Sequence, residues 1–244
     1  MLVVRDVFSK YRKSFLGVAW SMITPLSMVG VIGLVYSIVF GIPLIAFVPY
    51  LFSGLTPWLF ISGAIDSGTS SYIAAEGFIT QTKIHTEIFP LRMVLVAFVN
   101  YLFMSIAFFI VYALIKPDAF NLNMLLYIPS SIIIFIFCWG VANIVALINL
   151  YIRDYAYLQS ILLQILFYIT PLIYSPELMD KRGFSSIYKF NPIYYMMDIV
   201  RQSMLGATEI KIFIWGIAVM ISLSIFLISV YVTKKIGRNI VYRF

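Results

Sequence analysis

The stretch SFLGVAWSMITPLSMVGVIGLVYSIVFGIPLIAFVPYLFSGLTPWLFISGAI, residues 14–65, contains no charged side chain and decides the fold class. A membrane-spanning helix needs about 20 apolar residues, because each residue rises about 1.5 Å through a hydrocarbon core about 30 Å thick. The stretch is too long for one such helix, and Gly41-Ile42-Pro43 together with Pro49 offers a break. We therefore expect two spans, over residues 15–40 and 50–72.

Similar apolar runs continue along the chain, bounded by charges or prolines. They predict four further spans, over residues 93–115, 125–151 and 156–174 and in the charge-free interval between Lys211 and Lys234. The expected fold class is an all-α integral membrane protein with six transmembrane helices, in a single domain over residues 1–244. No internal repeat is visible.

Composition supports this class and narrows the chemistry. Of the residues, 62% are hydrophobic and 11% are charged, with a mean hydropathy of +1.00, whereas a soluble domain carries about 25% charged residues. We interpret the net charge of +7 as a sign of membrane topology and not of nucleic-acid binding. The single cysteine, Cys138, cannot form an internal disulfide, and the single histidine, His85, has no visible companions for a metal site.

Basic residues near the span ends predict the orientation. They cluster in both terminal segments, at Arg5, Lys10, Arg12, Lys13, Lys234, Lys235, Arg238 and Arg243. An even number of spans places both termini on one side, so both are expected in the cytoplasm, with the first span acting as the targeting signal. The connection between spans 5 and 6 does not fit this orientation, because it is placed outside the cytoplasm and yet carries the basic residues Lys181, Arg182, Lys189, Arg201 and Lys211. It is also the longest connection, and the rule weakens as loops lengthen.

Three segments are neither spans nor simple loops. Residues 1–14 alternate apolar and basic side chains at helical spacing, which predicts an interfacial helix. That helix is either a basic anchor or a contact for a partner or an anionic lipid. Residues 75–90, AEGFITQTKIHTEIFP, form either a cytoplasmic helix that docks a soluble subunit or an ordinary loop. Residues 171–206 are too apolar for a solvated loop, and two short re-entrant helices over 175–206 or a tight cap would account for them.

Four blocks of sequence resemble a known family. They are RDVFSKYRKSFLGVAWSMITPL at 5–26, SGLTPWLFIS at 53–62, INLYIRDYAYLQSILLQILFYITPLIY at 148–174 and NPIYYMMDIVRQ at 191–202. Together they are similar to the permease subunits of type-2 ABC polysaccharide exporters, which export O-antigen, teichoic acid or capsule chains. In the most common form of the segment at 75–90, a basic residue precedes a Phe-Pro pair after a short interval. Here Glu76-Gly77-Phe78-Ile79 and Gln81 come first and Phe89-Pro90 arrives late. The sequence of this segment resembles the O-antigen exporters more closely.

The resemblance implies a fold and partners. It implies six spans, an N-terminal interfacial helix, a cytoplasmic coupling helix between spans 2 and 3, and two short re-entrant helices between spans 5 and 6. It implies a homodimer coupled to two copies of a separate ATPase, which binds ATP and Mg; this chain has no GxxxxGK[ST] phosphate loop of its own. The likeness assigns coupling to Glu76, Gly77, Phe78, Ile79 and Gln81.

The resemblance also implies a substrate path across the bacterial inner membrane. A polysaccharide on an undecaprenyl pyrophosphate carrier would approach from the cytoplasm, where Arg12 and Lys13 either favour the pyrophosphate or only set topology. Because a sugar ring has an apolar face, aromatic side chains could hold the chain. Most aromatics are expected to be packing or interface anchors, and the candidates for contact are Trp20, Trp58, Tyr168 and Tyr174. Asp66 is either a functional intramembrane acid or a carboxylate that reaches the headgroups.

One alternative cargo and two other classes of protein remain open from the residues. Teichoic acid or capsular polysaccharide could replace O-antigen as the cargo. A membrane-embedded glycan-processing enzyme would need clustered carboxylates or histidines at the membrane face, and the nearest candidate is Asp154 beside Arg153. An ion-coupled carrier would carry charged residues at mid-membrane, and these spans have almost none.

Overall fold

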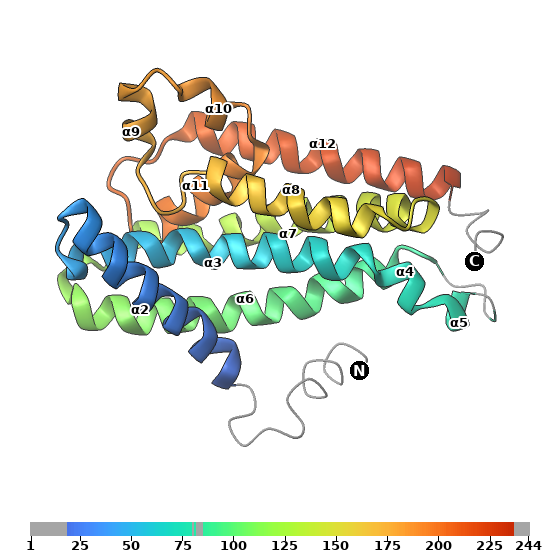
Figure 1. Ribbon diagram of the computed structural model, residues 1–244, viewed down its shortest axis with the longest axis horizontal. Helices are drawn as coiled ribbons and strands as arrows, with labels where there is room; N and C mark the ends of the chain where they lie inside the picture. The colour runs from blue at the N-terminus through green and yellow to red at the C-terminus, as the bar shows by residue number, and fades with distance from the viewer. Residues whose placement is uncertain (1–18, 80, 82–84, 237–244) are drawn as a thin grey trace.

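The computed structural model describes residues 19–79, 81 and 85–236, and all regular structure in this part of the chain is helical (Figure 1). Among the described residues, five helices are long and apolar enough to cross a membrane. Four of them are α2, Trp20–Phe40, α3, Leu44–Thr69, α6, Ile88–Ile115, and α12, Ile212–Ile236. The fifth crossing joins the short 3-10 helix η3, Leu122–Leu126, to α7, Tyr127–Tyr151. The expected all-helical membrane fold is confirmed in these described residues.

The predicted break between the first two spans is confirmed, but it is shorter than expected. Gly41 adopts a φ of 64°, which a glycine reaches without strain, and its N–H bonds the carbonyl of Ile38 at the end of α2. The next helix starts at Leu44 and not at Tyr50, so Pro49 lies inside α3. A proline removes one backbone hydrogen bond, and neighbouring helices commonly compensate for this loss in membrane spans.

The fifth predicted span forms α8, Tyr155–Ile169, which is shorter than the predicted 156–174. Its 15 residues give a helix about 22 Å long. The helix stops at Thr170 because a residue that precedes a proline, here Pro171, is driven into extended backbone, and Thr170 has a ψ of 132°. α8 lies beside α3 and runs along the bundle without covering its full length (Figure 1).

The connection between α8 and α12 contains three helices and not the two expected: α9, Pro176–Lys181, α10, Ser185–Lys189, and α11, Pro192–Met204. α9 and α10 lie at the end of the bundle that also holds the turn between α2 and α3 and the connection between α6 and α7, and we call it the α9 end (Figure 1). That connection contains η2, Pro117–Ala119. α11 differs from them, since it packs against α3, α7 and α12 and most of its side chains are buried. Asn191 caps its first turn by accepting from the N–H of Ile193.

The opposite end of the bundle carries α4, Ser71–Ala74, and α5, Glu76–Ile79, and we call it the α5 end (Figure 1). Between the ends, α3 is central, because α2, α6, α7, α8 and α11 all pack on it. Aromatic rings fill much of this core. The ring centroids of Phe60 and Tyr101 are 5.1 Å apart, and those of Phe52 and Phe108 are 5.6 Å apart. α3 is therefore a fixed centre, whereas α8 buries only Gln159 and Leu163.

The predicted interfacial helix over residues 1–14 lies outside the described residues, as do Arg12 and Lys13.

Candidate functional site

The segment predicted to couple to a partner forms a single helical turn. Glu76, Gly77 and Phe78 of α5 are exposed, and Phe78 keeps 61% of its surface. Ile79 instead points inward and packs in a small apolar cluster with Tyr72 and Phe89, so this residue anchors the turn. Gln81 is exposed. The described part of the segment thus combines an inward anchor with a surface that carries one large apolar ring.

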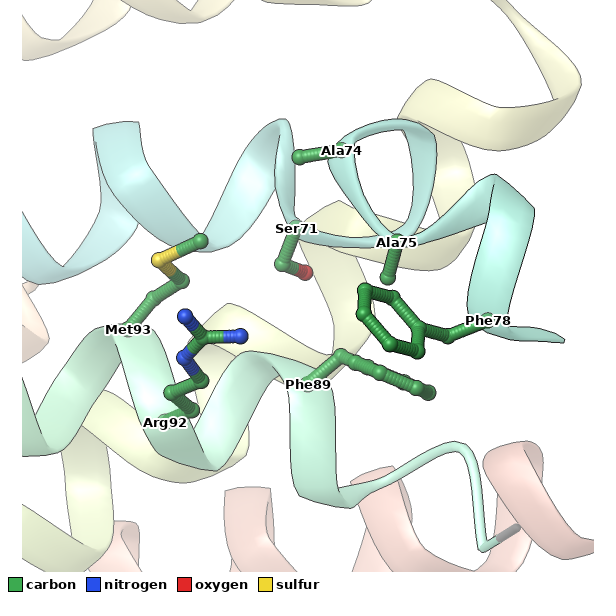
Figure 2. A pocket seen from close by; sticks show the side chains of 7 residues that line it. All are labelled: Ser71, Ala74, Ala75, Phe78, Phe89, Arg92 and Met93. Atoms are coloured by element: carbon green, nitrogen blue, oxygen red, sulfur yellow. The ribbon is translucent and has the colours of Figure 1, made fainter. Parts of the chain in front are cut away.

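A small hollow lies between this turn and the start of α6. It has a volume of about 30 Å³ and is lined by Ser71, Ala74, Ala75, Phe78, Phe89, Arg92 and Met93. Figure 2 shows the Phe78 ring turned back toward α6, beside Phe89. A space of this size holds about one water molecule. The hollow is therefore a small packing gap between α5 and α6 and not a pocket for a ligand.

The four aromatic residues predicted to contact the substrate occupy two kinds of position. Trp20 and Tyr168 are exposed, at 45% and 64%. Trp58 is buried, and its ring meets that of Phe167 edge-on with a centroid distance of 5.5 Å, so it packs α3 against α8. The Tyr174 hydroxyl donates to the carbonyl of Tyr168 at 2.8 Å, which satisfies the carboxyl end of α8.

A buried arginine at the α9 end was not singled out from the sequence. Arg201 of α11 is only 7% exposed. Its Nη1 donates to the Tyr50 hydroxyl at 2.9 Å and to the carbonyl of Pro171 at 3.0 Å, and its Nη2 donates to the carbonyl of Leu172 at 3.0 Å. The guanidinium also lies 4.2 Å from the centroid of the Tyr50 ring. We call Arg201, Tyr50, Pro171 and Leu172 the Arg201 cluster.

The Arg201 cluster holds the corner that follows α8. Tyr50 passes the interaction on, because its hydroxyl donates to the carbonyl of Tyr174 at 3.0 Å. Asn191 adds a second attachment, since its side-chain amide donates to the Thr170 hydroxyl at 2.7 Å. Gly54 leaves room for the guanidinium, because a Cβ at this position would lie 2.4 Å from Nη2 of Arg201. The corner is thereby tied to both α3 and α11.

A second polar cluster joins α8 to α3 nearer the α5 end. The Gln159 amide donates to Asp66 Oδ1 at 2.9 Å, and the Thr69 hydroxyl donates to the Gln159 carbonyl oxygen. Asn149 of α7 donates to the backbone carbonyl of Thr69 at 3.0 Å. We call Gln159, Asp66, Thr69 and Asn149 the Gln159 cluster. Asp66 is exposed, and its carboxylate acts here as an acceptor for a neighbouring helix.

A sequence signal for Arg201 exists in hindsight. In NPIYYMMDIVRQ the arginine follows Ile193, Met197 and Val200 at helical spacing, which places it on the apolar face of its helix. A charge on the buried face of a helix in a membrane protein is a candidate for a functional or structural role. From the sequence alone, Arg201 counted only as one of the basic residues of the long connection between spans 5 and 6.

The described residues hold no group of three or more His, Cys, Asp or Glu side chains that could bind a metal ion. Cys138 is fully buried in α7, where burial suits an inert packing role.

Comparison with known proteins places these features in context. The family model of the ABC-2 type transporters matches residues 1–205. The chain is 26% identical over 205 residues to an O-antigen export system permease protein RfbA of Klebsiella pneumoniae, which covers 84% of this chain and 78% of that protein. It is 25% identical over 197 residues to the protein of the same name from Myxococcus xanthus, which covers 80% of this chain and 75% of that protein. The similarity extends over most of each chain.

Proposed function

Because the chain belongs to the ABC-2 type transporter family and is a membrane permease subunit, not an ATPase subunit, we propose that it exports lipid-linked O-antigen polysaccharide from the cytoplasm. The observation that carries the proposal is the similarity to O-antigen export permeases over about four fifths of this chain, at 84% and 80% coverage. The cargo would be carried on undecaprenyl pyrophosphate. Teichoic acid and capsular polysaccharide are the alternative cargoes, and the glycan that accumulates without the permease distinguishes them.

We place six crossings in the membrane by adding α8 to the five long helices. A helix of about 22 Å is shorter than the hydrocarbon core of about 30 Å, and a local thinning or the corner after α8 can make up the difference. The course of α8, which begins at the α5 end and runs toward α10 and α11, supports this assignment (Figure 1). With basic residues Lys234 and Lys235 closing α12, we place the α5 end and both termini in the cytoplasm of a bacterial inner membrane.

The α5 end is the proposed contact with the ATPase. Association with an ABC ATPase follows from the family, and we propose two ATPase copies on a homodimer of this chain. The coupling residues are Glu76, Gly77, Phe78, Ile79 and Gln81. Ile79 would transmit motion because it is the one of these side chains that packs inward, against the cluster of Tyr72 and Phe89. ATP and Mg would bind to the partner subunit.

The proposed path for the glycan lies between α2 and α8 of the two copies. Trp20 and Tyr168 support this path because both rings are exposed on those two helices. Trp58 and Tyr174 would act indirectly, by holding α8 in place. α9, α10 and α11 would form the external mouth, with α11 as the segment that re-enters the bundle. Arg12 and Lys13 stay candidates for the pyrophosphate.

Deleting the gene tests the cargo. In the source bacterium, loss of the permease should stop surface display of the glycan and leave the lipid-linked glycan on the cytoplasmic side, and the intact gene should restore display. Normal surface glycan in the deletion strain would refute the proposal. Extraction of lipid-linked glycans followed by sugar analysis identifies which class accumulates.

The coupling role has its own test. Phe78→Ser should lower export at least 10-fold while the assembled complex still hydrolyses ATP, because an exposed ring is removed from the docking surface. Leu122→Ser is a matched control, since Leu122 is exposed at 82% at the opposite end of the bundle. Equal export by the two variants would show that the coupling assignment is wrong.

A further inference from the structure

The exposed surface of α8 is divided into two strips of different chemistry. At about 100° per residue, Tyr157, Ser160, Gln164 and Tyr168 fall within one sector of the helix, and all four are exposed. The neighbouring sector is wholly aliphatic and exposed as well, and consists of Leu158, Ile161, Leu162 and Ile165. The remaining side of the helix carries Gln159 and Leu163, which face α3 and are buried. The buried side fixes the direction in which each strip points.

Gln164 is the residue that sets the first strip apart. It lies about 13 Å along the helix from Tyr155 and about 8 Å from Ile169, so more than one turn separates it from either end. None of the hydrogen bonds found in the described part of the chain involves its side chain, which is exposed. Ser160 differs, because its hydroxyl donates back to the carbonyl of Ala156 at 3.1 Å. A carboxamide without a partner is costly to place against lipid tails, so this strip requires another environment.

The other exposed helices contrast with this strip. Their outward side chains are mainly aliphatic, as lipid contact requires, and include Val31, Leu34, Ile38, Leu223, Leu227 and Ile228. On α8 the aliphatic strip satisfies the same requirement. The polar strip lies beside it on the same helix, so one side of α8 suits lipid and the adjacent side suits water.

We infer that the strip of Tyr157, Ser160, Gln164 and Tyr168 faces the aqueous pathway and contacts the hydroxyl-rich glycan chain, with Gln164 as its hydrogen-bonding group. This inference rests on the proposed function. A carboxamide both donates to and accepts from sugar hydroxyls. Tyr157 and Tyr168 lie on one face about 16 Å apart and offer flat surfaces to sugar rings. The strip carries no charge, which suits a polyhydroxyl chain and not an ion.

Cysteine labelling tests which strip meets water. The native Cys138 is fully buried and contributes little background. Gln164→Cys and Ile165→Cys form a matched pair, because they lie at nearly the same depth on different strips. The full chain is produced with its ATPase, and membranes are treated with a membrane-impermeant methanethiosulfonate. We expect labelling at position 164 to be at least 10-fold faster than at position 165.

Two results would overturn the water-facing assignment. One is equal labelling, or none, at the two positions. The other is a disulfide between two copies of the Gln164→Cys variant, formed by copper phenanthroline without labelling, which would place this strip between the copies and away from water.

Glycan contact has a separate readout. Gln164→Leu should lower glycan export at least threefold while insertion and ATP hydrolysis stay unchanged, and Ile165→Gln provides the reverse substitution on the lipid strip. Unchanged export in Gln164→Leu would overturn the contact. One further outcome separates this inference from the proposed cargo. If position 164 is labelled fast but surface display of the glycan does not need this gene, the proposed cargo is wrong and the water-facing assignment still holds.

Discussion

The two polar clusters that attach α8 to the bundle differ in how much water they meet. In the Arg201 cluster a full positive charge is buried and is held by neutral oxygen atoms. In the Gln159 cluster the one charged member, Asp66, is exposed, and the three buried members, Gln159, Thr69 and Asn149, are neutral. Removing Arg201 leaves buried carbonyls without their donor, whereas removing Gln159 takes a donor from the Asp66 carboxylate, which water can reach. We therefore expect the α9 end of α8 to be held more strongly than its α5 end.

The sharpest way to break this comparison is Arg201→Met. We expect the free energy of unfolding to fall by about 3 kcal/mol, because each buried acceptor left without its donor costs about 1–3 kcal/mol. Thermal unfolding of the purified chain in detergent measures the loss. Lys189→Met is the control, since its side chain is 54% exposed and a change there should cost little. Equal stability of the two variants would contradict a structural role for the buried guanidinium.

Gly54→Ala tests the same cluster by crowding it. The added Cβ would lie 2.4 Å from Arg201 Nη2 and 3.0 Å from the Leu172 carbonyl oxygen, and overpacking of this kind costs about 1–3 kcal/mol. Gly63→Ala is a matched control on the same helix, because nothing lies within 4 Å of its Cβ position. We expect the control to keep or raise the unfolding temperature. A harmless Gly54→Ala would mean that the guanidinium can move aside.

Gln159→Leu tests the weaker cluster. Loss of hydrogen bonds at a site beside the exposed Asp66 should cost about 1 kcal/mol, which is less than for Arg201→Met. Gln164→Leu, on the exposed strip of the same helix, should change detergent stability by less than about 0.5 kcal/mol. The same unfolding assay ranks the three variants. A larger loss for Gln159→Leu than for Arg201→Met would reverse the comparison.

The smallest effect at neutral pH belongs to Tyr188 of α10. Burial, and then the hydrogen bond of 2.8 Å that its hydroxyl donates to Asp180, raise the pKa of Tyr188 from 10 to about 12. A raised pKa means that the folded state favours the protonated phenol. This contribution is complete below pH 10 and is lost as the pH rises toward 12. The unfolding temperature of Tyr188→Phe should therefore fall less steeply above pH 10 than that of the native chain.

The sequence predicted much of the fold because the relevant signals are local. The charge-free runs indicated the long helices, and Gly41 marked the turn between the first two. Local signals also erred in places. Pro49 was predicted to be part of a break although it lies within α3, and the fifth span was predicted to reach residue 174 although Pro171 ends that helix earlier. Pro171 acts locally, because it drives Thr170 into extended backbone, whereas Pro49 is accommodated by the helices that pack on α3.

The candidate site was less predictable. Trp58 and Tyr168 were grouped as aromatic residues that could touch a substrate, yet one is buried between helices and the other is exposed. Composition cannot separate these roles, since both side chains suit packing and interfaces equally. Arg201 was counted as a loop charge because its neighbours along the chain do not include its partners.

By itself, the sequence determined that this protein is a helical membrane protein, because apolar side chains that suit lipid recur along every span. Four blocks of sequence indicated its family. Only the tertiary structure decided which polar groups are buried together. Tyr50 and Arg201 are 151 residues apart and Asp66 and Gln159 are 93 apart. Hydrogen bonds between such distant positions depend on how helices pack, and that packing depends on the whole chain at once.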